Sequence, residues 1–284
     1  MQARVALVQF ACVLGDVDAN LAGIEAAVAD VAGVADLVVF PEMATTGSNL
    51  GGRLGDLAEA IPGSATDRLE RAAAAAGVHV VLGIAERRAG GGLPHNSAVW
   101  IDPSRGLCQV YRKVHLFSGE RECFTPGDRP AWVDAPWGRT ALTICYDLCF
   151  PEYVRALALA DATLVLNSTH WFADAATAPW GWSGAQVRAL AVARALENGL
   201  FVGMACRAGD EDDWRALGYS TLAGPSGRVE AGLEAGPGAA VGLIDPASVT
   251  AWRSVATYLA DRRTDLYRAI VADGGAAHVA GAPG

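Results

Sequence analysis

Short, wholly apolar runs along the chain alternate with longer stretches in which apolar residues recur every three or four positions. Runs such as RVALVQF (residues 4–10) and VHVVLGIAE (residues 78–86) predict buried strands, because their apolar residues are nearly continuous. Residues 19–32 carry Leu, Ile and Val at helical spacing, and the alanine-rich residues 64–77 end in a glycine typical of a helix terminus. The first half of the chain therefore predicts strands and helices in alternation.

The same alternation returns in the second half of the chain. Residues 139–147 and 162–168 predict strands, and residues 151–160 predict a helix that begins at a proline. Residues 183–199 predict another helix, which a serine caps and a glycine closes. Apolar strands that alternate with helices are typical of sheets covered on both faces, so we expect an α/β fold.

No linker of distinct composition divides the chain, so we expect a single domain over residues 1–270. The small residues that dominate residues 271–284 predict a flexible C-terminal tail.

Composition and charge narrow the classes of function. Hydrophobic residues make up 52% of the 284 residues, which is enough for a substantial core. The net charge is −9 and Lys and Arg are thinly spread, so nucleic acid is not expected as a partner. The acidic run GDEDDW (residues 209–214) predicts a solvated loop.

The chain has no long uncharged apolar stretch, so we expect no membrane partner. Its first residues lead directly into a strand pattern without a small-residue cleavage site, so we expect a cytoplasmic protein. The six cysteines form no CxxC pair and are too sparse for a disulfide scaffold.

Three predicted strands end in residues that carry chemistry. LVVFPE ends in Glu42, CQVYRK ends in Lys113, and ALTIC ends in Cys145. Functional sites of α/β folds gather at the carboxyl ends of strands, so we expect these three side chains to lie together. Each one taken alone has an ordinary structural explanation, as a loop residue or as a small buried thiol.

A carboxylate, an amine and a thiol together suffice for acyl transfer from an amide. A thiol is mostly protonated at neutral pH, and Glu42 could take its proton. Lys113 could stabilise the thiolate and the negative oxygen that forms when a carbonyl is attacked. The backbone N–H of Tyr146, directly after Cys145, could donate to the same oxygen.

Several blocks of the sequence resemble the nitrilase superfamily of carbon–nitrogen hydrolases. The blocks occur in the family's order between Arg4 and Tyr267, nearly the whole chain. They are FPE (residues 40–42), YRKVHLF (111–117), FTPGD (124–128), CYDLCFPE (145–152), ARALENGLFV (193–202), GYSTLAGPSGRV (218–229) and DRRTDLY (261–267).

The resemblance implies a role for each of these residues. It implies that Glu42 is the general base, Lys113 the oxyanion stabiliser and Cys145 the nucleophile. A second glutamate follows the lysine in this family, and we assign it to Glu120, with Glu122 as the alternative. The resemblance also implies a four-layer αββα sandwich, assembly into homodimers or larger homo-oligomers, and catalysis without a cofactor or metal.

The residues after Cys145 are similar to those of the amidase and carbamoylase branches. True nitrilases typically follow the cysteine with Trp-Glu, whereas this chain has Tyr146 and Asp147. We therefore expect a thiol-dependent amidohydrolase that releases ammonia from a small amide through a cysteine thioester. An N-carbamoyl amidohydrolase is the alternative, followed by a nitrilase or an amine acyltransferase.

Further residues of the same rim are candidates for binding the substrate. We expect Tyr146, Thr169 and Trp171 to contact it, because Thr169 and Trp171 follow the next predicted strand. His170 has no second histidine at ligand spacing, so we expect a hydrogen-bonded bystander and not a metal ligand. We expect His115 to be a supporting hydrogen-bonding residue.

Two readings from other classes remain. Cys145 and Cys149 stand four residues apart and could form a thiol switch, although this leaves Glu42 and Lys113 unexplained. A non-catalytic scaffold with the same fold is the other, and an intact set of reactive residues argues against it.

Overall fold

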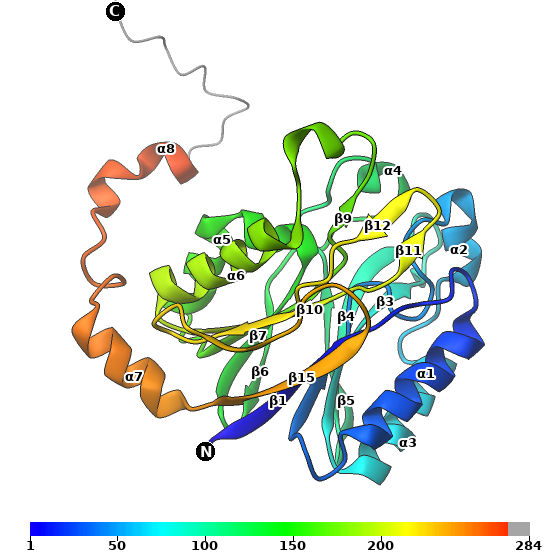
Figure 1. Ribbon diagram of the computed structural model, residues 1–284, viewed down its shortest axis with the longest axis horizontal. Coiled ribbons are helices and arrows are strands. Elements are labelled where there is room, and N and C mark those ends of the chain that lie inside the picture. Colours follow the sequence, from blue (N-terminus) through cyan, green and yellow to red (C-terminus); the bar gives the residue numbers. More distant parts are fainter. Residues whose placement is uncertain (272–284) are drawn as a thin grey trace, which may run out of the picture.

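Two six-stranded sheets pack face to face in the computed structural model, which describes residues 1–271 (Figure 1). The first sheet has the strand order β15-β1-β2-β3-β4-β5. Its strands are β1 (Ala3–Gln9), β2 (Leu37–Val39), β3 (His79–Glu86), β4 (His95–Asp102), β5 (Gly106–Arg112) and β15 (Gly238–Ile244).

The second sheet has the order β14-β13-β10-β8-β7-β6. Its strands are β6 (Ala131–Ala135), β7 (Gly138–Ile144), β8 (Leu164–Thr169), β10 (Phe201–Cys206), β13 (Thr221–Ala223) and β14 (Val229–Gly232). A small third sheet joins β9 (Phe172–Ala173), β11 (Asp210–Glu211) and β12 (Trp214–Ala216).

The two large sheets share one pattern of pairing. In the first sheet β1, β2 and β3 are parallel, and the flanking pairs β1–β15 and β3–β4 are antiparallel. In the second, β7, β8 and β10 are parallel, and β6–β7 and β10–β13 are antiparallel. The ends of β2 and β8 therefore occupy corresponding places in the two sheets.

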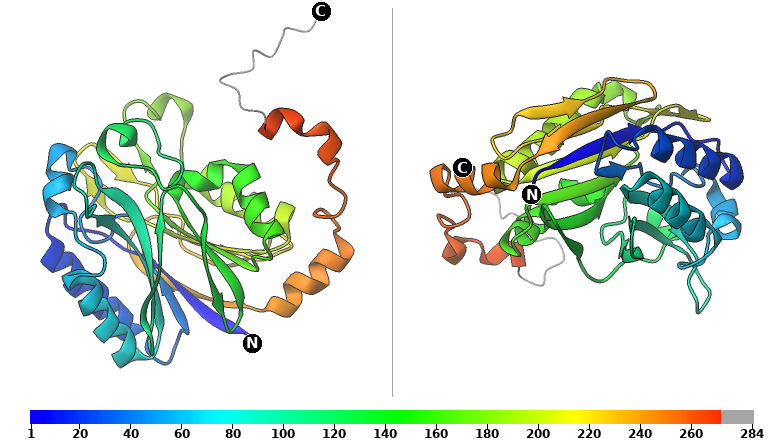
Figure 2. Two further views of the ribbon diagram at one scale, coloured as in Figure 1. Left: turned by 180° about the vertical axis from the view of Figure 1, so that it is seen from behind. Right: turned by 90° about the horizontal axis from the view of Figure 1, so that it is seen from below.

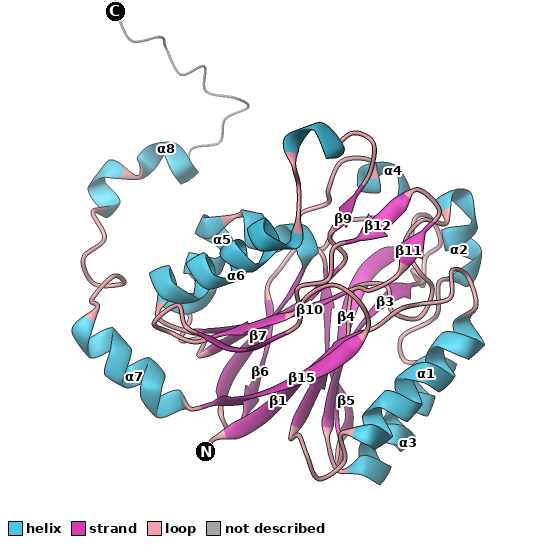
Figure 3. Ribbon diagram, viewed as in Figure 1, coloured by secondary structure: helices cyan, strands magenta, loops and turns pink. Residues whose placement is uncertain are grey.

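Helices cover the outer faces of both sheets (Figures 2 and 3). The longer helices are α1 (Val17–Asp30) and α3 (Ser64–Ala76) on the first sheet, and α5 (Pro151–Leu159) and α6 (Gly184–Asn198) on the second. The expected four-layer αββα sandwich is confirmed. Each parallel connection contains one of these helices, because a parallel crossover must pass over a sheet face.

Three apolar layers hold this arrangement together. Leu7, Trp100 and Tyr111 of the first sheet pack against Leu142 and Ile144 of the second. The other two layers lie between each sheet and its helices. The strands are apolar on both faces because each face is buried, which accounts for the continuous apolar runs in the sequence.

The local details differ from expectation in two places. The acidic run was expected to be a solvated loop, but β11 lies within it and Glu211 is buried. The third sheet and β6 were not expected, since their strands are short or weakly apolar.

The end of the described chain leaves the sandwich. After α7 (Pro246–Val255), the chain continues through a short 3₁₀ helix (Thr264–Leu266) to α8 (Arg268–Val271), away from the sheets (Figure 1). The shorter helices elsewhere are α2 (Leu54–Leu57) and α4 (Glu120–Cys123). Apart from Val271, the expected tail of residues 271–284 lies outside the described residues. Among residues 1–271, no helix combines the length and apolar character needed to cross a bilayer.

Candidate active site

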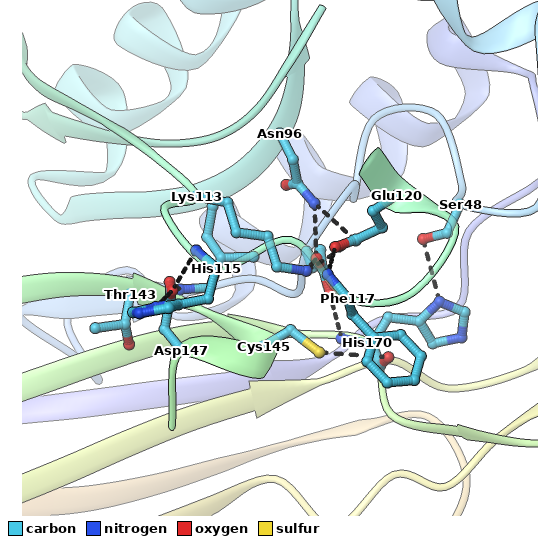
Figure 4. A network of polar contacts seen from close by, with 12 residues as sticks. Ser48, Asn96, Lys113, His115, Phe117, Glu120, Thr143, Cys145, Asp147 and His170 are labelled. Carbon is cyan, nitrogen blue, oxygen red and sulfur yellow. Dashed lines mark hydrogen bonds and ion pairs between the residues drawn. The ribbon is translucent and has the colours of Figure 1, made fainter. Parts of the chain in front are cut away.

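Cys145 lies in a tight turn directly after β7. The turn is a 3₁₀ helix (Cys145–Cys149), and Cys145 adopts a left-handed backbone conformation with φ +42°. A non-glycine residue in this conformation costs about 1–2 kcal/mol, so the surrounding contacts must hold it there. Its Sγ lies 3.8 Å from the carbonyl oxygen of His170, at the end of β8 (Figure 4).

Asp147 holds this turn in place. One carboxylate oxygen accepts hydrogen bonds from the Ile144 N–H (2.8 Å) and the Tyr111 hydroxyl (2.7 Å). The other contacts the His115 N–H (3.2 Å) and the His115 Nδ1 (2.8 Å). The expected supporting role of His115 as a hydrogen-bonding residue is confirmed by this contact. Asp147 thus joins the Cys145 turn to the segments on both sides of Lys113.

Glu42 follows β2 and is buried on the side of the second sheet. Its Oε1 accepts hydrogen bonds from Asn96 Nδ2 (2.7 Å) and Lys113 Nζ (2.8 Å). Its Oε2 accepts the backbone N–H of His170 (3.0 Å). Gly83 of β3 lies beneath it, where an added Cβ would stand 2.5 Å from the Glu42 Cα. The carboxylate is therefore fixed by groups from both large sheets.

Lys113 follows β5 and is fully buried between two carboxylates. Its Nζ lies 2.8 Å from Oε1 of Glu42 and 2.8 Å from Oε1 of Glu120. Burial lowers the pKa of the Lys113 ammonium, but the negative charges of Glu42, Cys145 and Glu120 outweigh it and raise that pKa above its ordinary value. Lys113 is therefore a permanent cation at this site.

Glu120, and not the alternative Glu122, is the second glutamate beside Lys113. Its other oxygen accepts the Phe117 N–H at 2.7 Å, whereas Glu122 is exposed. Burial raises the pKa of the Glu120 carboxyl. Of two carboxylates that share one ammonium, Glu120 is thus prone to hold a proton.

The thiol of Cys145 is neutral in this environment. Burial raises its pKa well above the ordinary value, the charge of Glu42 raises it further, and the charge of Lys113 opposes both. The nucleophile therefore needs a base when it attacks, because little thiolate is present beforehand.

A carboxylate, an ammonium and a thiol come together here from three strand ends. The sequence matches the family described as Carbon-nitrogen hydrolase over residues 4–254. This chain belongs to that family. The match covers the strand ends of both large sheets, so the predicted resemblance to the nitrilase superfamily is confirmed.

Some relatives in this carbon–nitrogen hydrolase family are named as amidases, and others, such as one from Pyrococcus abyssi that is 36% identical over 199 residues and covered to 71%, with 69% of this chain covered, are named as nitrilases. The chain is 39% identical over 234 residues to an (R)-stereoselective amidase of a Pseudomonas species, covering 81% of each chain. It is 31% identical over 238 residues to the 2-oxoglutaramate amidase of Bacillus subtilis, covering 82% of this chain and 87% of the relative.

Solved structures of the family have the same fold. An amidase from a Nesterenkonia species matches with a TM-score of 0.79 and 28% identity, covering 94% of this chain and 96% of that one. A variant of that amidase, with a TM-score of 0.78, 29% identity and coverage of 94% and 95%, carries the acetamide moiety of fluoroacetamide on its active-site cysteine.

The expected substrate-contacting residues lie around Cys145 in different ways. Thr169 is buried at the end of β8. The Tyr146 ring is half-buried between the rings of Phe117 and Phe150, with centroids 5.1 and 5.0 Å away. Trp171 is half-buried as well, and its ring meets that of Trp182 edge to face. Contact with a substrate stays a prediction for all three.

His170 makes hydrogen bonds, as expected, and its partners include the proposed base Glu42. Its N–H holds Glu42, its carbonyl faces Cys145, and its ring Nδ1 lies 3.1 Å from the Ser48 hydroxyl. Burial lowers the pKa of the imidazole well below its ordinary value, and the charge of Arg207 lowers it further, so the ring is neutral.

Behind His170, a buried ion pair supports the same segment. Arg207 lies 2.7 Å from Glu211, whose Oε2 accepts the N–H groups of Ser48 (2.9 Å) and Asn49 (2.8 Å). The sequence did not predict this role of Glu211. Glu211 lies in an acidic run, and its partner Arg207 precedes that run at the end of an apolar strand.

The described part of the chain contains no set of side chains arranged to bind a metal ion. No group of three His, Cys, Asp or Glu side chains there could hold an ion. Cys145 and Cys149 are both free thiols.

Proposed function

We propose that this chain is a thiol-dependent amidohydrolase that cleaves the C–N bond of a small amide and releases ammonia. The observation that carries this proposal is the contact of Lys113 with both Glu42 and Glu120, at 2.8 Å each, beside the buried thiol of Cys145. This set contains a base, an oxyanion partner, a second proton carrier and a nucleophile.

The first half of the reaction forms a thioester. Sγ of Cys145 attacks the carbonyl carbon of the amide, and Glu42 takes the thiol proton. The negative oxygen of the tetrahedral intermediate lies against the Lys113 ammonium and the N–H of Tyr146. The C–N bond breaks as Glu42 returns the proton to the nitrogen, and ammonia leaves.

The second half hydrolyses that thioester. Water gives a proton to Glu42 and its oxygen attacks the acyl carbon, while Lys113 again stabilises the negative oxygen. The C–S bond breaks, and the proton on Glu42 returns to the sulfur. Glu120 keeps Lys113 oriented and can hold a proton, because burial raises its pKa.

Two features favour a small amide over the other substrates of the superfamily. Several relatives have amidase names, namely a stereoselective amidase, a 2-oxoglutaramate amidase and an omega-amidase, and these support amide hydrolysis, whereas two others are named as nitrilases. The reacting groups are also deeply buried, with Cys145 only 8% exposed, which suits a compact acyl group. In our proposal Tyr146, Thr169 and Trp171 contact that group.

We also propose a single hydrolase domain over residues 1–270, acting as a cytoplasmic homodimer. All six cysteines are free thiols, as is usual in a reducing compartment. The end of α7 and the segment after it carry large apolar side chains in water, with Val255 78%, Leu266 67% and Ile270 56% exposed. A second copy of the chain would cover such residues. Light scattering after size-exclusion chromatography tests the dimer.

Ammonia release from a substrate panel tests the reaction. The panel pairs short aliphatic amides and ω-amides of dicarboxylic acids with N-carbamoyl compounds and matched nitriles. Wild type, Cys145→Ala and the matched control Cys149→Ala are compared. We expect wild type to release ammonia from an amide. The Cys145→Ala variant should release none, and the Cys149→Ala variant should release it as wild type does.

Other results redirect the proposal. Equal loss in both variants would favour a thiol pair, and release from the nitriles alone would favour a nitrilase. No release, with Cys145 found acylated by mass spectrometry, would indicate an acyltransferase that lacks its acceptor amine.

A further inference from the structure

We infer that Asn96 is a positioning residue that holds the two carboxylates of the site around Lys113. The inference rests on the proposed function, since it concerns how Glu42 is kept as a base. Asn96 is not among the residues that the sequence marks as reactive.

Asn96 contacts three of the four proposed catalytic residues. Its Nδ2 lies 2.7 Å from Oε1 of Glu42 and 3.5 Å from Oε1 of Glu120. Its backbone carbonyl accepts the N–H of Lys113 at 2.8 Å. These are the same two carboxylate oxygens that the Lys113 ammonium contacts, so the amide and the ammonium together bridge the two carboxylates. Figure 4 shows Asn96 and Lys113 beside Glu120.

The register of the first sheet brings Asn96 to this point. Residue 97 pairs with Arg112, the last residue of β5, so Asn96 stands opposite Lys113. Along β4, Ala98 and Trp100 belong to the apolar layer between the two sheets, whereas Val99 and Ile101 pack toward the helices. Asn96 shares the parity of Ala98 and Trp100, so it faces the second sheet.

A polar side chain on that face needs a reason other than packing. Asn96 is 1% exposed, and burying an amide costs free energy that an apolar residue would avoid. The hydrogen bonds of its Nδ2 go to the two carboxylates and offset part of this cost, whereas its Oδ1 is buried without a partner. The amide is therefore present for the site and not for the core.

Charge explains why an amide suits this position. Lys113 offers one positive charge to two carboxylates, so the cluster has no excess positive charge and the Glu42 carboxylate can accept the thiol proton. A second cation at residue 96 would weaken Glu42 as a base, and a third carboxylate would repel both partners. An amide donates a hydrogen bond to the ionised form and adds no charge.

Removal of this donor should move the pH dependence of the reaction. A hydrogen bond to a carboxylate favours its ionised form, so Asn96→Ala raises the pKa of the carboxylate pair. We expect the acid limb of kcat/KM to shift upward by about one pH unit. We expect kcat to fall by about 10- to 100-fold, less than loss of the whole base would cost, and KM to change by less than about 3-fold.

Asn198 provides a matched control. It is also 1% exposed, and its Nδ2 donates to the Arg194 carbonyl at 2.9 Å inside α6. Asn198→Ala should lower stability as Asn96→Ala does, while its acid limb stays where wild type has it. Asn96→Ser, which keeps a donor, replaces Asn96→Ala if the latter does not fold, and its smaller side chain should give a shift in the same direction.

A readout independent of the substrate separates this inference from the proposed function. Alkylation of Cys145 by iodoacetamide, followed over pH in wild type and in the Asn96 variants, reports the base that assists the thiol. An upward shift of its acid limb in the variants supports the inference even if the panel finds no substrate. An acid limb unchanged in both assays, with activity lost only in proportion to folded protein, would overturn it.

Discussion

The hydroxyl of Tyr111 donates a hydrogen bond of 2.7 Å to Oδ2 of Asp147, and this contact joins the strand that leads to Lys113 to the turn of Cys145. The two residues are 36 positions apart in the sequence: Tyr111 lies in β5 of the first sheet, and Asp147 lies in the turn that follows β7 of the second. Asp147 accepts from Ile144 and His115 as well, so one carboxylate sets how the nucleophile and the ammonium lie relative to each other.

Asp147→Asn should therefore impair both stability and turnover. The amide NH₂ cannot accept from the donors that now face one carboxylate oxygen, so at least one buried donor loses its partner. We expect a loss of about 1–3 kcal/mol in the free energy of unfolding, measured in urea, and a fall in kcat of at least about 10-fold. Asp134→Asn, at an exposed ion pair with Arg139, serves as the control and should change neither quantity. Full activity of Asp147→Asn would contradict the role of Asp147 in holding the Cys145 turn in place.

Gly83→Ala should damage the site although residue 83 carries no chemistry. The added Cβ would stand 2.5 Å from the Cα of Glu42, 2.6 Å from the carbonyl oxygen of Pro41 and 2.8 Å from the N of Met43. These are backbone atoms, so Glu42 itself must move. We expect a loss of about 1–3 kcal/mol of stability and of about 100-fold in kcat.

A second alanine substitution separates this effect from a general one. Gly55 lies in α2 with nothing within 4 Å of its ideal Cβ, so Gly55→Ala should leave activity intact. Urea unfolding and ammonia release measure both variants. Equal activity of the two proteins would show that Glu42 tolerates displacement.

The Cys145 thiol should remain protonated through neutral pH. Burial and the nearby Glu42 raise the pKa of the thiol well above the ordinary value. Thiolate therefore forms only as the pH approaches and passes this raised pKa, and it is absent at neutral pH. The absorbance at about 240 nm of wild type minus Cys145→Ala should therefore stay flat from about pH 6 to 8, below the pKa of about 8.5 of a free thiol. A titration step inside this window would indicate a preformed thiolate and a different first step.

Glu211→Gln should destabilise the protein, because Glu211 forms the buried ion pair with Arg207 next to His170. The substitution leaves the Arg207 guanidinium buried at 1% exposure without its counter-charge, which costs about 3–5 kcal/mol. Urea unfolding measures the loss. Glu230→Gln, at the more exposed pair with Arg228, is the control and should leave the unfolding midpoint close to wild type. Similar midpoints for the two variants would show that the buried pair contributes little.

Apolar continuity and strand ends allowed much of the fold and the core of the site to be predicted from the sequence. Lys113 and Cys145 follow their strands directly and Glu42 comes three residues after β2, so the rule that sites gather at the carboxyl ends of strands applies to all three. Glu120 needed the family resemblance, because no strand precedes it and its place depends on how the loop after Lys113 folds back.

Asn96 and Glu211 were not predicted because their partners are distant in sequence. Asn96 contacts Glu42 across 54 positions, and only the pairing of β4 with β5 brings it there. Its signal in the sequence was a polar residue in the alternate positions shared with Ala98 and Trp100. Glu211 contacts Ser48 across 163 positions, and the prediction of a solvated loop, which was based on the acidic residues around Glu211, was wrong for this residue.

The reacting groups are divided between two sheets that the interior keeps apart. Glu42 and Lys113 extend from the first sheet, and Cys145 extends from the second. The thickness of the apolar layer between them, set by side chains such as Trp100 and Leu142, therefore determines how far the base stands from the nucleophile. A change of one methyl group in this layer alters a chemical distance as well as a volume. The rate of this enzyme is, in that sense, a measure of how well its core is filled.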